Sequence, residues 1–160
     1  MIKRYGDSPR AGQIYRRRPG VYAVLLDKGA LLATHQADPL PEYQLPGGGI
    51  DRGEHPIAAL HREVMEETGL TVAVGQPALI NEFHDPMSGF HQVDIFFHCT
   101  ITAGQINPKW RDPEGIVTQR RFFARDDLEL GRIRFKPDSL PTAAWGGEGL
   151  LYDPLERLIR

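Results

Sequence analysis

The chain has 160 residues, of which 41% are hydrophobic and 25% are charged, as is usual for a soluble globular protein that folds as one domain. The formal net charge of −2 gives no global reason to bind nucleic acid or an anionic membrane. No apolar run approaches the roughly 18 residues of a membrane-spanning helix. The single cysteine, Cys99, rules out an internal disulfide. With no apolar segment of a signal peptide, we expect a cytoplasmic protein.

Residues 1–19 are polar and basic, and end in Arg16, Arg17, Arg18 and Pro19. The simplest interpretation is a solvated lead-in segment before the domain. The alternative is a rim that attracts the phosphates of a ligand. On that alternative, Arg18 is a candidate substrate-binding residue.

The first half of the chain predicts three strands and one helix. Residues 20–36 predict two strands around a turn at residues 27–29, and residues 42–49 predict a short strand that ends at Pro46 and three glycines. Residues 55–69 predict the clearest helix of the chain. Pro56 suits its first turn and Gly69 suits the position that follows its last turn.

The second half predicts mainly strands. Residues 71–85 and 91–104 have strand character, residues 105–115 form a loop, and the segment from residue 116 is a strand that leads into an acidic corner. Residues 139–145 and 153–160 are predicted as short helices. Because strands outnumber helices and do not alternate regularly with them, the fold class is α+β, with a mixed sheet and a helix packed on it.

The predicted helix has an apolar side and an acidic side. At about 100° per residue, one side carries residues that we expect to dock on the sheet, namely Ile57, Leu60, Val64 and Thr68. Glu63, Glu66 and Glu67 fall within roughly 100° of one another on the other side.

These three glutamates allow two interpretations. A solvated acidic face is the usual explanation of a charge run. However, like charges at this spacing destabilise a helix, no basic residue is interleaved among them, and the helix end is already negative. The alternative is a divalent cation site, because hard oxygen ligands suit Mg²⁺ or Mn²⁺ and such a site usually also binds substrate phosphates. The preceding glycines, Gly47–Gly49, would let backbone groups approach the same ion or phosphate.

The segment 48–70 resembles the signature of the Nudix hydrolases, G-x5-E-x7-R-E-U-x-E-E-x-G-U, where U is a bulky aliphatic residue. Gly48 and Glu54 match its start, and Arg62 to Leu70 match its end, so that every specified position agrees. The resemblance covers about a seventh of the chain. It implies the Nudix fold, an α/β/α sandwich around a mixed β-sheet, formed by residues 1–160 as a single domain.

The resemblance also implies which residues bind metal. By position, Glu63, Glu66 and Glu67 would be ligands of one or more Mg²⁺ ions, with Mn²⁺ as a possible substitute, and Gly48 would supply a backbone carbonyl. Glu54 and Arg62 match positions that hold the loop against the helix through an ion pair.

The implied reaction is hydrolysis of a pyrophosphate bond in a nucleoside diphosphate linked to a moiety X, with a metal-activated water as nucleophile. The general base is a glutamate of the signature or one from a later loop, where Glu114 is the best candidate. A solvated loop acid is the alternative for Glu114. His84 and Glu82 are lesser candidates. A different class of function, a Nudix-fold nucleotide-binding or sensor domain without turnover, stays open.

The substrate is the weakest part of the prediction. Tyr43 and Phe83, like Trp110 and Phe90, could stack on a base, and ordinary packing is the alternative for each. We take Tyr43 and Phe83, with Arg18, as candidate substrate-binding residues. Pro86 hints at ADP-ribose-type members of the family, but ADP-sugars, nucleoside triphosphates and dinucleoside polyphosphates all remain open. We expect a small-molecule nucleotide substrate, no membrane or stable nucleic-acid partner, and possibly a homodimer.

Overall fold

The structure, a computed structural model, describes residues 19–37, 42–87, 90–133, 135, 137–147 and 149–157. Its strands are β1 (Gly20–Asp27), β2 (Ala30–Gln36), β3 (Glu42–Gln44), β4 (Gly47–Gly49), β5 (Thr71–Asp85), β6 (Phe90–Ala103), β7 (Val117–Phe123) and β8 (Leu151–Arg157). Its helices are α1 (Pro56–Thr68), α2 (Arg125–Glu129) and α3 (Leu140–Trp145). No helix of the described residues is long and apolar enough to cross a membrane.

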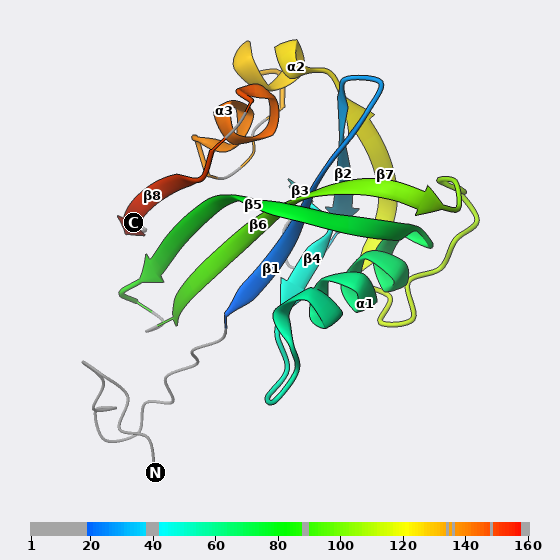
Figure 1. Cartoon of the computed structure of the whole chain (residues 1–160), viewed down its shortest axis with the longest axis horizontal. Helices are drawn as coiled ribbons and strands as arrows, with labels where there is room; N and C mark the ends of the chain where they lie inside the picture. The colour runs from blue at the N-terminus through cyan, green and yellow to red at the C-terminus, as the bar shows by residue number, and fades with distance from the viewer. Residues whose placement is uncertain are drawn as a thin grey trace.

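The strands form one mixed sheet in the order β3-β2-β1-β6-β5-β8 (Figure 1). Strand β4 also pairs with β1, and β7 also pairs with β2. The β1–β6 and β5–β8 pairs are parallel and the other pairs are antiparallel. The predicted α+β class with a mixed sheet is therefore confirmed.

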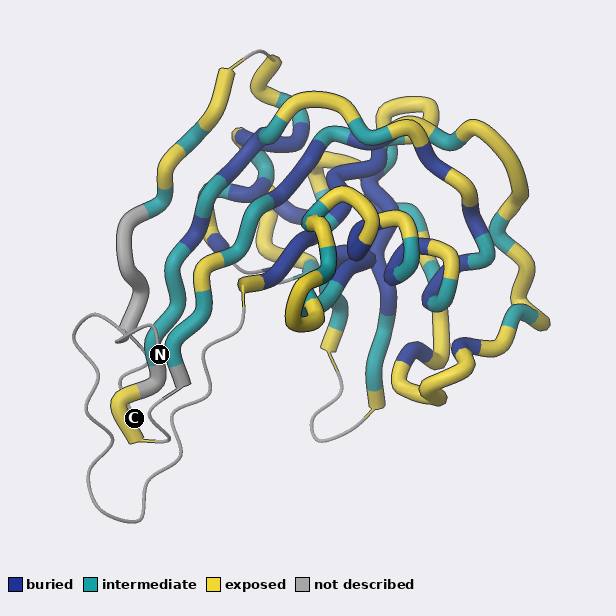
Figure 2. Tube along the Cα trace, turned by 60° about the horizontal axis from the view of Figure 1, so that its bottom comes forward, coloured by how far each residue is buried: buried dark blue, intermediate teal, exposed yellow. Residues whose placement is uncertain are grey.

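A separate hydrophobic cluster lies on each face of the sheet. One cluster joins β1, β5 and β6 to α2 and α3, and includes Phe96, Leu128 and Leu140. The other joins the same sheet to α1, and includes Leu60, Val64 and Phe97. Figure 1 shows α1 on one side of the long strands β5 and β6, and α2 and α3 on the other. In Figure 2 the buried stretches of the trace run through the middle of the sheet and the inner side of α1.

The turn and the glycine segment near the start show how local chemistry shapes the sheet. Lys28 and Gly29 both have positive φ, 50° and 79°, as a two-residue hairpin turn requires. The predicted short strand is present as β3 and ends before Pro46, but the glycines after it, expected to be a loop, form the further strand β4 against β1. A side chain on Gly47 would come within 2.7 Å of the Tyr22 Cα, so only glycine permits this pairing.

The C-terminal segment corrects a second prediction. Residues 153–160 are not a helix as far as they are described, because Leu151–Arg157 form strand β8. Strand β8 pairs with β5 in parallel, with Leu79 opposite Leu151. The open edge of β5 needs a hydrogen-bonding partner, and this tertiary contact overrides the helix-forming character of the sequence. The predicted helix at residues 139–145 is confirmed as α3, and the acidic corner contains the short helix α2.

Helix α1 begins and ends as predicted. Pro56 stands in its first turn, and His55 Nδ1 accepts a hydrogen bond from the Ile57 N–H at 3.2 Å. Gly69 ends the helix with φ 75°. The docking face is narrower than predicted. Leu60, Val64 and Thr68 are buried, whereas Ile57 is 38% exposed because it lies in the first turn, beyond the edge of the sheet.

The two ends of this face can be compared by mutation. We expect Leu60→Ala to lower the free energy of unfolding by about 2–5 kcal/mol, because it opens a cavity in the core. Ile57→Ala is the matched control, and should lower it by less than about 1 kcal/mol, since the side chain is partly solvated and alanine favours the helix. Urea denaturation measures both values. Equal losses would contradict the observed orientation of α1.

Candidate functional site

The carboxylates of α1 do not lie opposite the apolar side, as the helical wheel predicted, and the interpretation of a solvated acidic face does not hold for two of the three. Glu63 and Glu67 are both buried, with 8% of each residue exposed. Glu67 lies only about 20° from Leu60 around the helix axis, so the acidic and apolar sides adjoin. The wheel prediction failed because it placed the sheet at the centre of the apolar side and did not include β4. Glu67 Oε2 accepts a hydrogen bond from the Gly47 N–H at 3.0 Å.

The glycines of β4 form the floor beneath these acids. A side chain on Gly48 would stand 2.8 Å from the carboxyl carbon of Glu63. Because glycine has no such atom, the Glu63 carboxylate can lie directly against the backbone of residue 48. The predicted approach of the glycine backbone to the glutamates is therefore present.

Burial makes the charges of these acids unfavourable. Loss of solvent raises the pKa of Glu67 to about 9, opposed by the hydrogen bond from Gly47. The same cause raises the pKa of Glu63 to about 6, opposed by Arg62. The charge of Glu63 also raises the pKa of Glu67, and the charge of Glu66 raises that of Glu63. A bound cation would offset the free-energy cost of burying these two carboxylate charges.

Arg62 is the basic residue nearest to the cluster. Its guanidinium binds Glu54 through two hydrogen bonds, at 2.8 and 2.9 Å, so the expected ion pair is present. The same guanidinium also donates to Glu63 at 3.0 Å and lies 3.4 Å from Glu66. The expectation that no basic residue offsets the three glutamates is therefore wrong, because Arg62 reaches two of them from an adjacent helix position.

The loop between β6 and β7 brings Glu114 toward the cluster. The charge of Glu114 contributes to the raised pKa of both Glu63 and Glu67, so this exposed residue lies within electrostatic range of both acids. Buried Asp112 shapes this part of the loop. Its carboxylate accepts hydrogen bonds from the backbone N–H groups of Glu114, Ile116 and Val117.

The same loop is attached to the C-terminal end of α1. The Trp110 indole N–H donates to the Glu66 carbonyl at 2.9 Å, and the Arg120 guanidinium donates to the carbonyls of Glu67 and Trp110. These are carbonyls that a helix end leaves without intrahelical partners. A side chain on Gly69 would come within 2.8 Å of the Trp110 ring, so glycine also makes room for the indole.

Sequence reasoning missed Arg120 and Asp112 and saw Trp110 only as a possible stacking residue. No local pattern marks Trp110 and Arg120, whose partners on α1 are carbonyls 44 and 53 positions away. Asp112 accepts from N–H groups two to five positions further along, so the Asp-Pro-Glu-Gly turn at residues 112–115 was a local signal for it.

The remaining candidates lie away from these contacts. Tyr43 lies against His35 and Phe123, with ring centroids 4.8 and 4.9 Å apart. Glu82 accepts a hydrogen bond from the Tyr152 hydroxyl at 3.0 Å, and the rings of His84 and His91 are 5.4 Å apart.

Phe83 lies in β5 opposite Gln92 of β6. Pro86 lies in the turn that follows β5. Arg18 and the side chain of Phe90 lie outside the described residues.

The chemistry of the acids fits a hard divalent cation, since carboxylate and backbone oxygens are what such an ion prefers. Across the ranges that the structure describes, no three acidic, histidine or cysteine side chains are already grouped to hold an ion. Glu63 and Glu66 are turned toward Arg62 instead. An ion would therefore have to take the place of Arg62 at these oxygens.

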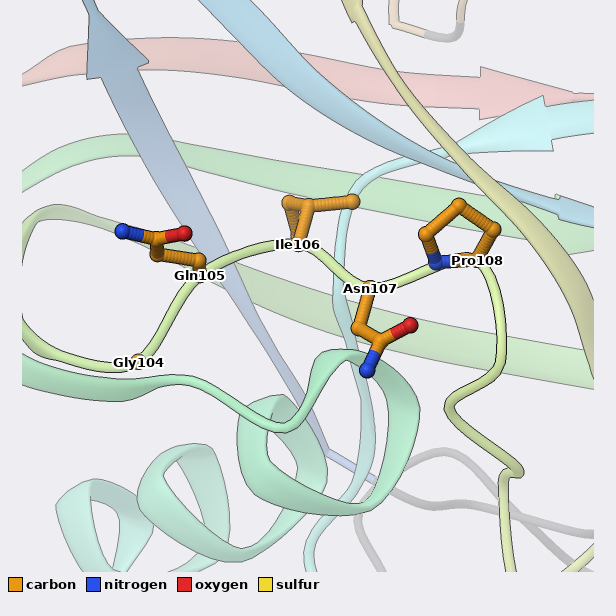
Figure 3. A pocket seen from close by; sticks show the side chains of 5 residues that line it. All are labelled: Gly104, Gln105, Ile106, Asn107 and Pro108. Carbon is orange, nitrogen blue, oxygen red and sulfur yellow. The ribbon is translucent and has the colours of Figure 1, made fainter.

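A shallow hollow of about 600 Å³ lies beside the last turn of α1 and is unrelated to these acids. Figure 3 shows its lining, a single stretch of the loop from Gly104 to Pro108, with Asn107 pointing toward the helix. Because no ionisable side chain lines it, we assign it no chemistry.

The sequence model of the NUDIX domain matches residues 16–145. The RNA pyrophosphohydrolase of Cereibacter sphaeroides (strain ATCC 17029 / ATH 2.4.9) is 47% identical over 55 residues, 33% of this chain and 34% of that protein. The putative 8-oxo-dGTP diphosphatase of Bacillus subtilis (strain 168) is 31% identical over 86 residues, 54% of this chain and 55% of that one. The chain thus spans about a third to a half of the length of these curated relatives.

Solved structures show the same fold. A NUDIX hydrolase from Nitrosomonas europaea has a TM-score of 0.68 at 18% identity, over 82% of this chain and 89% of that chain. A UDP-X diphosphatase has a TM-score of 0.67 at 20% identity, over 91% of this chain and 70% of that chain. At these identities the likeness concerns the fold alone, and the predicted fold is confirmed.

Arg62 should be worth more to stability than a surface arginine. We expect Arg62→Met to lower the free energy of unfolding by about 1–3 kcal/mol in metal-free buffer, because three carboxylates lose their common partner. Arg125→Met is the matched control, since the Arg125–Glu129 pair is a solvated pair within one helix, and should cost less than about 0.5 kcal/mol. Urea denaturation with a chelator present compares the two. Similar losses would show that the Arg62 network adds nothing beyond a surface pair.

Proposed function

The chain belongs to the NUDIX domain family, and from that premise we propose that it is a metal-dependent hydrolase of pyrophosphate bonds in small nucleotides. One observation carries the proposal. Glu63 and Glu67 are buried against the glycine backbone of β4, and burial raises the pKa of both. Such carboxylates have little structural reason to be there and a clear reason if they bind a cation.

We assign the cation to Glu63, Glu66 and Glu67, with the backbone carbonyl of Gly48 as a further donor, and expect Mg²⁺ with Mn²⁺ as a substitute. When bound, the cation would supply charge for the phosphate oxygens and acidify a water molecule. Neighbouring residues hold the carboxylate oxygens of these ligands in position. The Gly47 N–H orients Glu67, and the absence of a side chain at Gly48 gives Glu63 its position.

Arg62 acts as a positioning residue in this proposal. It binds Glu54 through two hydrogen bonds and fixes the loop that follows β4 against the helix. Its contacts with Glu63 and Glu66 are the ones that a cation would replace, while its bonds to Glu54 would stay.

Glu114 is the general base that we propose. It lies on the loop between β6 and β7, which Asp112 and Trp110 tie down through hydrogen bonds to the Glu114 N–H and to the Glu66 carbonyl. A carboxylate on a fixed loop beside the acids can accept the proton of an attacking water without being a ligand itself. Because His84 and Glu82 contact residues of β6 and β8, we do not assign them this role.

The substrate class follows from the relatives only in outline. Their names include an RNA pyrophosphohydrolase and a putative 8-oxo-dGTP diphosphatase, which share a pyrophosphate bond on a nucleoside. We propose that one NUDIX domain formed by the whole chain acts on a nucleotide with such a bond.

The proposed metal site can be tested with Glu67→Gln. We expect hydrolysis of a panel of nucleoside triphosphates, nucleoside diphosphate sugars and dinucleoside polyphosphates to require Mg²⁺ and to stop with excess chelator. Glu67→Gln should lower kcat by at least about 100-fold, because it removes a charged ligand. Glu129→Gln is the matched control and should retain activity, since this exposed acid lies in α2.

The alternative function would give a different result in the same experiment. If the wild type binds nucleotides but turns none of them over, the chain is a binding or sensor domain. If Glu67→Gln equals the wild type in turnover, the metal assignment is wrong.

The proposed role of Glu114 as general base can be tested with a separate variant. We expect Glu114→Gln to lower kcat by about 10²–10⁴-fold and to flatten the acidic limb of the pH–rate profile, because the base is lost. The midpoint of Mg²⁺ activation should stay within a factor of about three of the wild type. A large shift of that midpoint with a normal pH profile would instead make Glu114 a metal ligand.

A further inference from the structure

A row of polar side chains crosses the sheet on the face opposite α1. Gly20 of β1 lies in register with Asp94 of β6, Asp94 with Asn81 of β5, and Asn81 with Asp153 of β8. The next row toward the core is apolar and begins with Tyr22 and Phe96, whose rings stack with centroids 5.2 Å apart. The polar row therefore borders the core and does not simply face solvent.

Asp94 is an acid that the proposed chemistry does not use. Its carboxylate accepts a hydrogen bond from the Gln92 amide, and no cation of the described residues pairs with it. Burial raises its pKa to about 6, opposed by Gln92, so that it remains an acceptor above neutral pH. Gly20 makes room for it, because a side chain there would collide with both Asp94 and Gln92.

Asn81 beside it is 5% exposed, yet none of the hydrogen bonds within the described residues involves its side-chain amide. An amide with two donors and an acceptor thus lies beside a carboxylate with only acceptors, in register on neighbouring strands.

This polar pair adjoins the metal acids. The ring of Tyr22 links the two groups. Its Cε2 lies 3.1 Å from the position of a side chain on Gly20, which Asp94 also occupies, and its Cδ1 lies 2.7 Å from the position of a side chain on Gly47. The Gly47 N–H in turn binds Glu67 at 3.0 Å. On the other side of Asp94, Phe83 lies opposite Gln92 in the same strand pair and offers an aromatic ring. A ligand whose phosphates lie at Glu63 and Glu67 could place its nucleoside on this row.

We propose that Asp94 and Asn81 form a base-reading site that selects guanine nucleotides, with Asp94 as the specificity-determining residue. Guanine presents two adjacent N–H donors, N1 and the N2 amino group, and the O6 acceptor beside them. A carboxylate accepts the two donors, and the Asn81 amide donates to O6. Adenine has an unprotonated N1, which is an acceptor, and carries an amino group where guanine has O6. The lone pair of its N1 would therefore face the carboxylate.

The inference rests on the proposed function, since it places the base of the same substrate. A ribose diol also offers two adjacent donors to a carboxylate. Guanine is favoured because the neighbouring Asn81 supplies the donor that O6 needs and a diol does not.

The test compares GTP, ITP, ATP and 2′-deoxy-GTP as substrates of the wild type and Asp94→Asn. We expect the wild type to prefer GTP over ATP in kcat/KM by at least about tenfold, with ITP between them because it lacks the N2 amino group. Asp94→Asn should lower kcat/KM for GTP and 2′-deoxy-GTP alike by about 10–100-fold and change ATP by less than about threefold. Asp126→Asn, an exposed acid in the first turn of α2, is the matched control and should leave the ratios unchanged.

A second measurement keeps the inference independent of turnover. Calorimetric binding of GMP and AMP should show the same preference, and Asp94→Asn should remove it while the melting temperature stays within a few degrees of the wild type. If Asp94→Asn weakens GTP and ATP equally and spares 2′-deoxy-GTP, the row binds a ribose and the guanine assignment is overturned. If the wild type shows no base preference, the inference fails although the hydrolase remains. If no nucleotide is hydrolysed but GMP is still preferred, the proposed function fails and the base-reading site stands.

Discussion

The burial of Glu63 and Glu67 against the glycine backbone of β4 is the constraint on which the rest of the site depends. Two carboxylates at this depth are unstable as charges. The absence of a side chain at Gly48 makes room for Glu63, and the absence of one at Gly47 lets β4 pair with β1, so that the Gly47 N–H can bind Glu67. The glycines in turn need β1 as a partner, and the helix needs Leu60 and Val64 in the core beneath it. Packing energy from the core therefore holds unfavourable charges in place, and a bound cation would make the arrangement favourable.

The contacts at the C-terminal end of α1 serve the same arrangement from the other side. A helix ends in carbonyls without partners, and these usually go to water or to a capping residue. Here the indole of Trp110 and the guanidinium of Arg120 take the carbonyls of Glu66 and Glu67, the same residues whose side chains point to the proposed metal site. Movement of the loop that carries Glu114 is thus coupled to the backbone of two proposed ligands. This gives a physical reason for the loop to be long and yet well attached.

The proposed metal ligands and the polar row lie on different faces of the sheet. The face under α1 carries the acids, whereas the polar row of Gly20, Asp94 and Asn81 lies on the other face, next to Tyr22. Both groups depend on glycines of paired strands, since Gly20 makes room for Asp94 as Gly48 does for Glu63. Close pairing of β1 with β4 and β6 therefore creates both places at which a nucleotide could be held.

The sequence alone determined the features that depend on neighbouring residues. The turn at Lys28-Gly29, the start of α1 at Pro56, its end at Gly69 and the strands before and after it follow from local preferences, and the spacing from Gly48 to Leu70 identified the family. Only the tertiary structure decided which side of α1 is buried. The apolar and acidic sides adjoin, and the position of β4 determines that Glu63 and Glu67 are buried together with the apolar residues. The tertiary structure also decided that residues 151–157 form a strand on the open edge of β5, and that Trp110 and Arg120 bind the carbonyls at the end of α1. The partners of these two residues are distant in sequence, and the free energy of a long-range contact leaves no pattern in the residues around either partner.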